Sequence, residues 1–171
     1  AIVTLIDMLK ALIVIYSIWA ILAFTPLKDY CIVNSFDCRP IYYWIGGLAV
    51  CFGHCFSIFL HFKGGKTVAC FYGMMMGTSW IGLAFAAFWL ITFLKKKMVS
   101  LASIIGGLCE VILTWILFGV SFVKEVRIQQ FMWTFGLPDG LYPGLFLAIS
   151  ATIIYLLLLY RHKDNIKRIR N

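Results

Sequence analysis

The sequence predicts an all-α fold: a polytopic transmembrane helical bundle that forms one integral membrane domain over residues 1–171. The first observation is composition, since 63% of the residues are hydrophobic and only 13% are charged, whereas soluble domains carry about 25% charged residues. The second is that the apolar residues gather into stretches of about 20, the length an α-helix needs to cross a bilayer. No polar stretch is long enough to build a separate soluble domain.

Four apolar stretches are predicted to be full spans, each bounded by charged or turn-forming residues. They are Ile2–Phe24, Ile41–Phe62, Ala102–Val123 and Leu141–Tyr160. The segment Thr25–Pro40 is predicted to be a loop because it holds two prolines and four charges. A polar and aromatic loop is expected at Lys124–Gly140, and the basic tail Arg161–Asn171 follows the last span.

The apolar segment Thr67–Leu94 is too long for a single upright span. As one helix its 28 residues would measure about 42 Å, against a hydrocarbon core of about 30 Å. A strong tilt could absorb the excess. A break at Gly73–Ser79 would instead give a short re-entrant helix followed by a fifth full span. We expect the break, because it places Phe62–Lys66 and Lys95–Lys97 on the same side.

The distribution of basic residues supports the broken arrangement. Ten lysines and arginines then face one side and four face the other, which makes the first side cytoplasmic. The ten are Lys63, Lys66, Lys95, Lys96, Lys97, Arg161, Lys163, Lys167, Arg168 and Arg170. The net charge of +8 therefore reflects membrane orientation, and no nucleic-acid partner is expected.

The polar insert Phe62–Lys66 is the strongest candidate for a binding site. Gly64 and Gly65 allow a tight turn and a close approach of the backbone to a ligand. Lys63 and Lys66 place two cations at the same point, and together these features indicate an anion cradle, with phosphate as the natural anion. The alternative is a charged turn that serves membrane orientation alone.

The tail contains a second group of polar residues. His162 and Asn165 are three apart and share a face if the last helix continues through them. Histidine can transfer protons near neutral pH, and asparagine can bind or orient an oxygen. The alternative is a solvated tail that contacts anionic lipid headgroups.

Charged residues also occur inside predicted spans, where they indicate function by default. Glu110 lies beside Gly106 and Gly107, so a paired carboxylate between close-packed helices is the competing structural interpretation. Asp7 and Lys10 are three apart on one helix face and are expected to pair with each other or with the site.

One spacing resembles part of a metal site. Cys51, His54 and Cys55 fall at positions i, i+3 and i+4 of one helix, but structural zinc requires four ligands, usually from more than one element. No second cluster is visible, so no metal is predicted and the cysteines are interpreted as packing residues.

The segment GHCFSIFLHFKGGKTVAC resembles the bacterial acyl-phosphate:glycerol-3-phosphate acyltransferases, the PlsY family, which carry G-H-x-F-P-x-F-x-x-F-K-G-G-K-G-V-A-T. LIDMLKA resembles the family's L-x-D-x-x-K-G, and RHKDNIKRIRN resembles its R-H-x-x-N-I-x-R-L. The matching positions are Asp7, Lys10, Gly53, His54, Phe56, Phe59, Phe62, Lys63, Gly64, Gly65, Lys66, Val68, Ala69, Arg161, His162, Asn165, Ile166 and Arg168.

Some positions depart from the family pattern. Ala11 and Thr67 replace usual glycines, Ser57 a usual proline and Cys70 a usual threonine. The side chain of Thr67 is expected to crowd the loop. The first family signature, a Ser/Gly/Asn/Thr/Arg-rich loop after an N-terminal span, and the Gly-x-Glu after the tail block are absent. We expect either a chain trimmed at both ends, from a seven-span protein, or a degenerate homologue.

The resemblance implies a membrane enzyme that moves a fatty acyl group from acyl phosphate to the 1-hydroxyl of glycerol 3-phosphate, without a metal or cofactor. It implies catalytic roles for His162 and Asn165, and supporting roles for Asp7 and Lys10. Glu110 is a further candidate for a supporting role, because of its position inside a span. The implied phosphate- and substrate-binding residues are His54, Lys63, Gly64, Gly65, Lys66, Thr67 and Arg161. The expected location is a bacterial plasma membrane among its lipids, with the site facing the cytoplasm. The alternatives are a transporter or lipid-binding bundle without catalysis, and an inactive truncated homologue.

Overall fold

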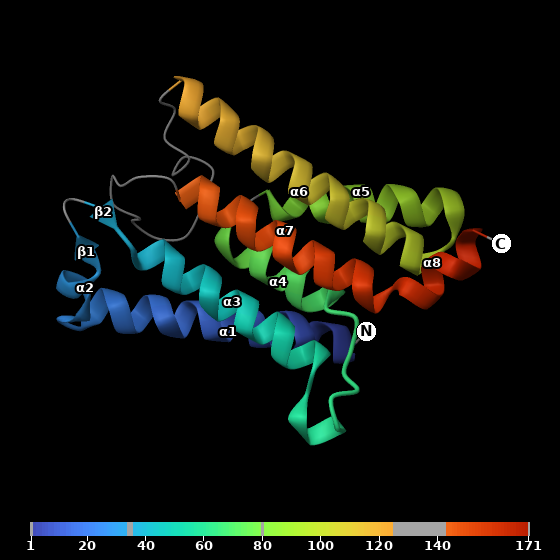
Figure 1. Cartoon of the computed structure of the whole chain (residues 1–171), viewed down its shortest axis with the longest axis horizontal. Helices are drawn as coiled ribbons and strands as arrows, with labels where there is room; N and C mark the ends of the chain where they lie inside the picture. Colours follow the sequence, from blue (N-terminus) through green and yellow to red (C-terminus); the bar gives the residue numbers. More distant parts are fainter. Residues whose placement is uncertain (1, 34–35, 80, 125–142, 171) are drawn as a thin grey trace.

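The computed structural model describes residues 2–33, 36–79, 81–124 and 143–170. Within these residues the chain is a bundle of helices that run back and forth along the long axis of the molecule (Figure 1). The helices are α1 (Ile2–Phe24), α2 (Leu27–Tyr30), α3 (Arg39–Cys55), the 3-10 helix η1 (Ile58–Leu60), α4 (Val68–Thr78), α5 (Gly82–Lys96), α6 (Val99–Lys124), α7 (Pro143–Arg161) and α8 (Lys163–Arg170). Two short strands, β1 (Ile32–Val33) and β2 (Phe36–Asp37), pair antiparallel.

Three described segments are long and apolar enough to cross a membrane: Ile2–Phe24, Arg39–Leu60 and Val99–Val120. Shorter apolar helices cover Val68–Gly77 and Leu145–Arg161. Apolar side chains also point outward from these helices, as at Phe24, which is 80% exposed. A helix that is apolar all round suits a lipid environment, so the predicted helical, membrane-type fold is confirmed.

The core lies where α1, α3, α4 and α7 meet. Its fully buried side chains include Ile15 from α1, Trp44 from α3, Phe71 from α4 and Ile154 from α7. At Gly73 an added Cβ would contact the backbone of α1. Only a glycine at this position therefore allows α1 and α4 to pack this closely.

The predicted break in Thr67–Leu94 is confirmed, but it begins only at the last residue of the predicted Gly73–Ser79 stretch, since Gly73–Thr78 are helical. α4 ends at Thr78, Ser79 has an extended backbone, and α5 begins at Gly82. The hydroxyl of Ser79 accepts a hydrogen bond from the amide of Ile81 at 3.1 Å, which helps to start the second helix. As a result, the start of α4 and the end of α5 lie at the same end of the bundle, together with α8 (Figure 1).

Other predicted boundaries need correction. α1 has the predicted bounds, but α3 ends at Cys55, seven residues before the predicted end at Phe62. The segment Thr25–Pro40 is not simply a loop, since it contains α2, β1 and β2. α6 starts three residues before the predicted Ala102. Most of the predicted loop at 124–140, and residues 141–142 of the last predicted span, lie outside the described residues.

Candidate functional site

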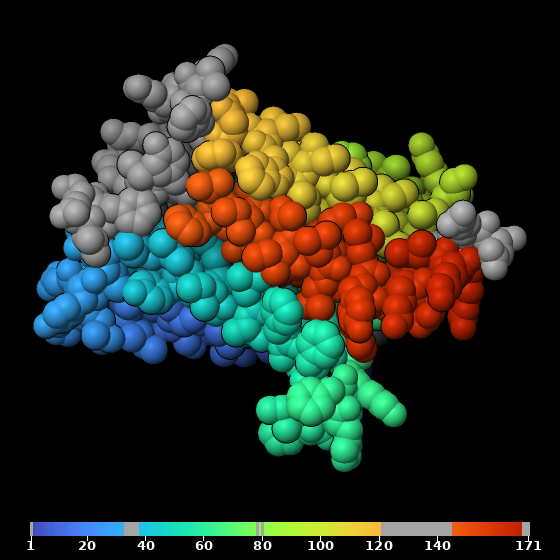
Figure 2. Space-filling model, viewed as in Figure 1, coloured from blue at the N-terminus to red at the C-terminus, as the bar shows by residue number. Residues whose placement is uncertain are grey.

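The chain folds back on itself directly after α3, in a segment we call the glycine loop (residues 56–67). The amide of Phe62 donates to the Ser57 carbonyl at 2.9 Å, and His61 and Phe62 have positive φ values of 51° and 61°. The tip projects away from the helices (Figure 2). Phe59 at this tip is 94% exposed.

The two glycines of the loop cap the end of α3. The amide of Gly64 donates to the Cys55 carbonyl at 3.1 Å, and that of Gly65 donates to the His54 carbonyl at 3.0 Å. These bonds satisfy carbonyls that a helix end leaves unpaired, which explains why α3 ends at Cys55. The expectation that these two amides hold a phosphate is therefore corrected, because both already bond to the protein.

The same glycines are needed for packing against His54. A Cβ at Gly64 would collide with the His54 carbonyl oxygen, and a Cβ at Gly65 would collide with the imidazole ring. The close approach that the sequence indicated at the glycines is real, but the partner in the structure is His54.

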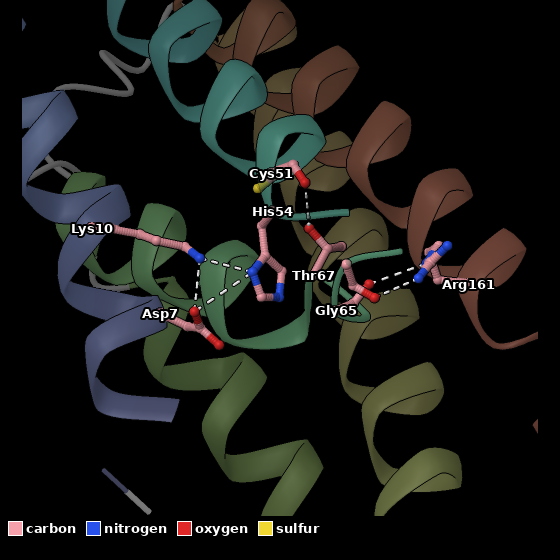
Figure 3. A network of polar contacts seen from close by, with 8 residues as sticks. Asp7, Lys10, Cys51, His54, Gly65, Thr67 and Arg161 are labelled. Carbon is pink, nitrogen blue, oxygen red and sulfur yellow. Dashed lines mark hydrogen bonds and ion pairs between the residues drawn. The ribbon is translucent and has the colours of Figure 1, made fainter. Parts of the chain in front are cut away.

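Arg161, at the end of α7, holds the loop from the other side (Figure 3). Its guanidinium donates to the carbonyls of Gly64 at 2.5 Å and Gly65 at 3.1 Å, and it lies 5.9 Å from the ring centroid of Phe56. Such charge-assisted bonds are the stronger kind in proteins. Arg161 therefore positions the loop, a role that the sequence did not indicate.

A polar network joins α1 to the end of α3 (Figure 3). The Lys10 ammonium donates to Asp7 Oδ1 at 2.7 Å and lies 2.7 Å from His54 Nδ1, so the predicted pairing of Asp7 with Lys10 is confirmed. Because a lysine ammonium can only donate, His54 accepts at Nδ1. Its hydrogen is then on Nε2, the atom that faces Gly65.

A cleft of about 520 Å³ opens between α1, α3 and the glycine loop. Its apolar wall includes Val14 and Val50, and its polar wall includes Asp7, Lys10 and His54. The cleft thus offers an apolar surface beside a cation and a histidine, at the end of the bundle where the basic residues gather.

Thr67 forms the junction between the loop and α4. Its φ is 62°, unusual for a β-branched residue, and its buried hydroxyl donates to the Cys51 carbonyl at 3.2 Å. The side chain is thus directed into the protein, so the expected crowding of the loop is corrected. The N-cap residue Thr67 makes no side-chain cap hydrogen bond at the start of α4, and a helix start generally leaves amide donors that an anion can accept.

The remaining predicted residues are more dispersed. Lys63 and Lys66 are exposed on the loop. His162 is buried at the turn after α7, with Nδ1 bonded to the Leu158 carbonyl at 2.9 Å. Burial lowers the pKa of His162, and the nearby charge of Lys66 lowers it further, although the bond to Leu158 opposes this.

Asn165 and Glu110 lie in other surroundings. The Asn165 amide donates to Ser100 Oγ at 2.6 Å, which ties α8 to the start of α6. The Glu110 side chain is fully buried, and neither carboxylate oxygen has a hydrogen-bond partner of ordinary geometry among the described residues, although the Phe85 backbone lies nearby.

Sequence reasoning missed one member of the site. The ligand atoms of Asp7, His54 and Cys70 all lie within 4.8 Å of one another. These residues come from α1, α3 and α4, so no sequence spacing could have grouped them.

Comparison with known proteins supports a relationship over the whole chain. A family model described as glycerol-3-phosphate acyltransferase matches residues 1–171. A glycerol-3-phosphate acyltransferase of Jannaschia sp. (strain CCS1) is 36% identical over 126 residues, which cover 73% of this chain and 50% of the relative. One of Chlorobium luteolum is 30% identical over 171 residues, covering 98% of this chain and 70% of the relative. This chain thus spans about half the length of the first of these curated relatives.

Solved structures show a similar fold. PlsY (YgiH), an integral membrane glycerol 3-phosphate acyltransferase, superimposes in its lysophosphatidic acid form with a TM-score of 0.63 at 29% identity, covering 98% of this chain and 67% of the other. Its glycerol 3-phosphate form gives a TM-score of 0.59 at 27% identity, covering 98% and 66%.

Proposed function

Because the chain belongs to the glycerol-3-phosphate acyltransferase family, we propose that it acylates the 1-hydroxyl of sn-glycerol 3-phosphate with acyl phosphate as donor. The hydroxyl oxygen attacks the acyl carbonyl carbon, and the bond from that carbon to the phosphate oxygen breaks. The products are lysophosphatidic acid and inorganic phosphate. The observation that carries this proposal is the family match over residues 1–171.

The site supports the proposal through its placement of cations. Lys63 and Lys66 are exposed beside the uncapped start of α4, where backbone amides and the helix dipole favour an anion. We assign the phosphate of a substrate to this position, held by the lysines and by the α4 amides in place of the glycine amides. Arg161 and His54 act indirectly, by positioning the loop that carries the lysines.

The proton of the attacking hydroxyl needs an acceptor. Since the Nδ1 hydrogen of His162 is donated to Leu158, Nε2 carries the lone pair, and the lowered pKa keeps the ring neutral. We assign His162 as the proton acceptor or as an orienting group for the substrate. Asn165 receives weaker support as a catalytic residue, because its amide is engaged with Ser100.

We also propose a membrane arrangement. α4 is about 16 Å long, about half of a hydrocarbon core of about 30 Å, so we assign it as a re-entrant helix, whereas α5, at about 22 Å, covers most of the core and is assigned as a span. α1, α3, α5, α6 and α7 are the five full spans. The end that carries the lysine clusters faces the cytoplasm of a bacterial cell.

A transporter or a lipid-binding bundle is the competing function. Transporters place their substrate sites near the middle of the membrane, at broken helices. Here the candidate site is formed at helix ends, around the glycine loop and the end of α7. This position favours chemistry at the membrane surface, where a lipid-soluble and a water-soluble substrate can meet.

The proposal is tested by comparing two lysine substitutions in a steady-state assay with acyl phosphate and labelled glycerol 3-phosphate. Lys66→Ala should lower kcat/KM for glycerol 3-phosphate about 10- to 150-fold, because a charge-assisted contact contributes about 1.5–3 kcal/mol. Lys96→Ala is the matched control, since Lys96 ends α5 outside the glycine loop, and it should change the value less than about twofold. Small and equal effects would show that the loop is only a charged turn, and no turnover by the wild type would refute the enzymatic proposal.

A further inference from the structure

Three potential metal ligands meet beside the candidate site, where α1, α3 and α4 come together. Asp7 Oδ1 lies 3.5 Å from His54 Nδ1, and the Cys70 thiol completes a set whose ligand atoms all lie within 4.8 Å of one another. Asp7 and His54 line the cleft, while Cys70 is fully buried behind them. An ion could therefore enter from the cleft and reach all three atoms.

A positive charge already lies among these ligands. The Lys10 ammonium is 2.7 Å from both Asp7 Oδ1 and His54 Nδ1, and it also lies near the Cys70 thiol. The ammonium shows that the ligand atoms converge on a point suited to a cation. His54 Nδ1 already directs its lone pair toward that point, as a metal ligand must.

The distances fit a small divalent cation. Tetrahedral zinc bonds of about 2.0–2.3 Å place neighbouring ligand atoms about 3.3–3.6 Å apart. The Asp7–His54 separation of 3.5 Å is within this range, and Cys70 needs a shift of at most about 1.2–1.5 Å, within reach of a side-chain rotation. The mixed oxygen, nitrogen and sulfur donors suit zinc better than magnesium or calcium, which prefer oxygen alone.

We propose that Asp7, His54 and Cys70 bind Zn²⁺ in competition with the Lys10 ammonium. The thiol of Cys70 loses its proton on binding, and Lys10 moves into the cleft that it already lines. Three protein ligands leave the fourth position open to water, as in zinc sites that are not purely structural. The bound ion replaces the Lys10–His54 contact, and through His54 it disturbs the glycine loop, so zinc inhibits acyl transfer. The inhibition rests on the proposed function, whereas the binding does not.

The binding is tested with Co²⁺ and Zn²⁺ on the full chain in lipid nanodiscs. Co²⁺ should bind once per chain and produce a thiolate-to-cobalt charge-transfer band, which Zn²⁺ abolishes by displacement. Cys70→Ser should remove the band and raise the apparent Kd for Zn²⁺ at least tenfold. Even the substitution of a residue that only hydrogen-bonds to a metal ligand lowers metal affinity 10- to 100-fold. Lys10→Met should lower that Kd several-fold, because the competing charge is gone.

Cys109→Ser is the matched control, because Cys109 is a partly buried thiol on α6, outside the cluster. It should leave both the band and the Kd unchanged. If Cys70→Ser fails to fold, Asp7→Asn provides the same measurement of zinc affinity. Absence of a thiolate band in the wild type, or zinc binding that Cys70→Ser leaves intact, would overturn the proposal. A zinc site in a chain that shows no acyl transfer would refute only the proposed function.

Discussion

Gly65→Ala tests whether the glycine loop depends on the position of the His54 ring. A Cβ at residue 65 would collide with the His54 ring, closest to Nε2 and next closest to Cε1 at 2.5 Å, so the imidazole must move by more than about 1 Å to restore an ordinary contact of about 3.5 Å. Residue 65 is not in the left-handed region of φ, so alanine adds no backbone strain. The change therefore acts through the ring alone.

The movement should disrupt the Lys10–His54 contact. The ring meets residue 65 through Nε2 and Lys10 through Nδ1, so a displacement of about 1 Å or more cannot keep the Nζ–Nδ1 distance of 2.7 Å and its hydrogen-bond geometry. A bond to a charged group contributes about 1.5–3 kcal/mol, which corresponds to about 10- to 150-fold. We expect a loss of this size in kcat/KM in the acyl-phosphate assay, with a lower melting temperature in detergent.

Two further variants determine whether this explanation is right. Gly53→Ala is the matched control, since a Cβ there meets nothing within 4 Å, and it should be nearly neutral. In a His54→Ala background, Gly65→Ala should cause almost no further loss in kcat/KM, because the ring that its Cβ would meet is gone. If the two losses add in full, residue 65 acts independently of His54 and the reasoning fails.

The other predictions concern a buried histidine, a buried carboxyl group and the tip of the loop. Because burial lowers the pKa of His162 below 6.5, the stability that its neutral form contributes is fully present above about pH 6.5 and is lost as the pH falls toward the lowered value. The melting temperature should therefore fall more steeply between pH 7.5 and pH 5 for the wild type than for His162→Gln. An equal fall in both proteins would contradict this. Glu110→Gln should melt no lower than the wild type, because it keeps the shape of a buried side chain without its charge, whereas Glu110→Ala should lose about 2 kcal/mol or more by leaving a cavity; equal losses would show that the charge itself is needed. The fluorescence of the tryptophan introduced by Phe59→Trp should be quenched by brominated lipids, because an exposed aromatic side chain at the loop tip suits the membrane interface. Fluorescence that brominated lipids do not quench would place the tip in water.

Hydropathy and segment length are sufficient to predict most of the helical architecture. The bounds of α1 follow from its apolar stretch alone, and the excess length of Thr67–Leu94 predicts the break that the structure has at Ser79. These are local properties of the chain, because the cost of placing a polar group in lipid applies to each segment separately. The three motif blocks likewise indicate the family from the order and spacing of their residues.

The end of α3 shows where local reasoning is insufficient. Residues 56–62 are mostly apolar and resemble a continuation of the span. They leave the helix because the amides of Gly64 and Gly65 return to cap it, and Arg161, almost 100 residues further along, holds the same glycines by their carbonyls. A helix boundary that depends on so distant a side chain cannot be predicted from its own sequence.

The composition of the site also depends on packing between distant segments. The sequence indicates phosphate binding for the glycines, whereas their amides are occupied and the start of α4 is left open. Nothing near Cys70 in the sequence is a partner for it, and only the meeting of three helices brings it to Asp7 and His54. Local sequence is thus enough to predict which segments are helical and which family they belong to. The packing of the helices determines which polar atoms face one another, because hydrogen bonds and ligand sets depend on distances between residues that are far apart in the chain.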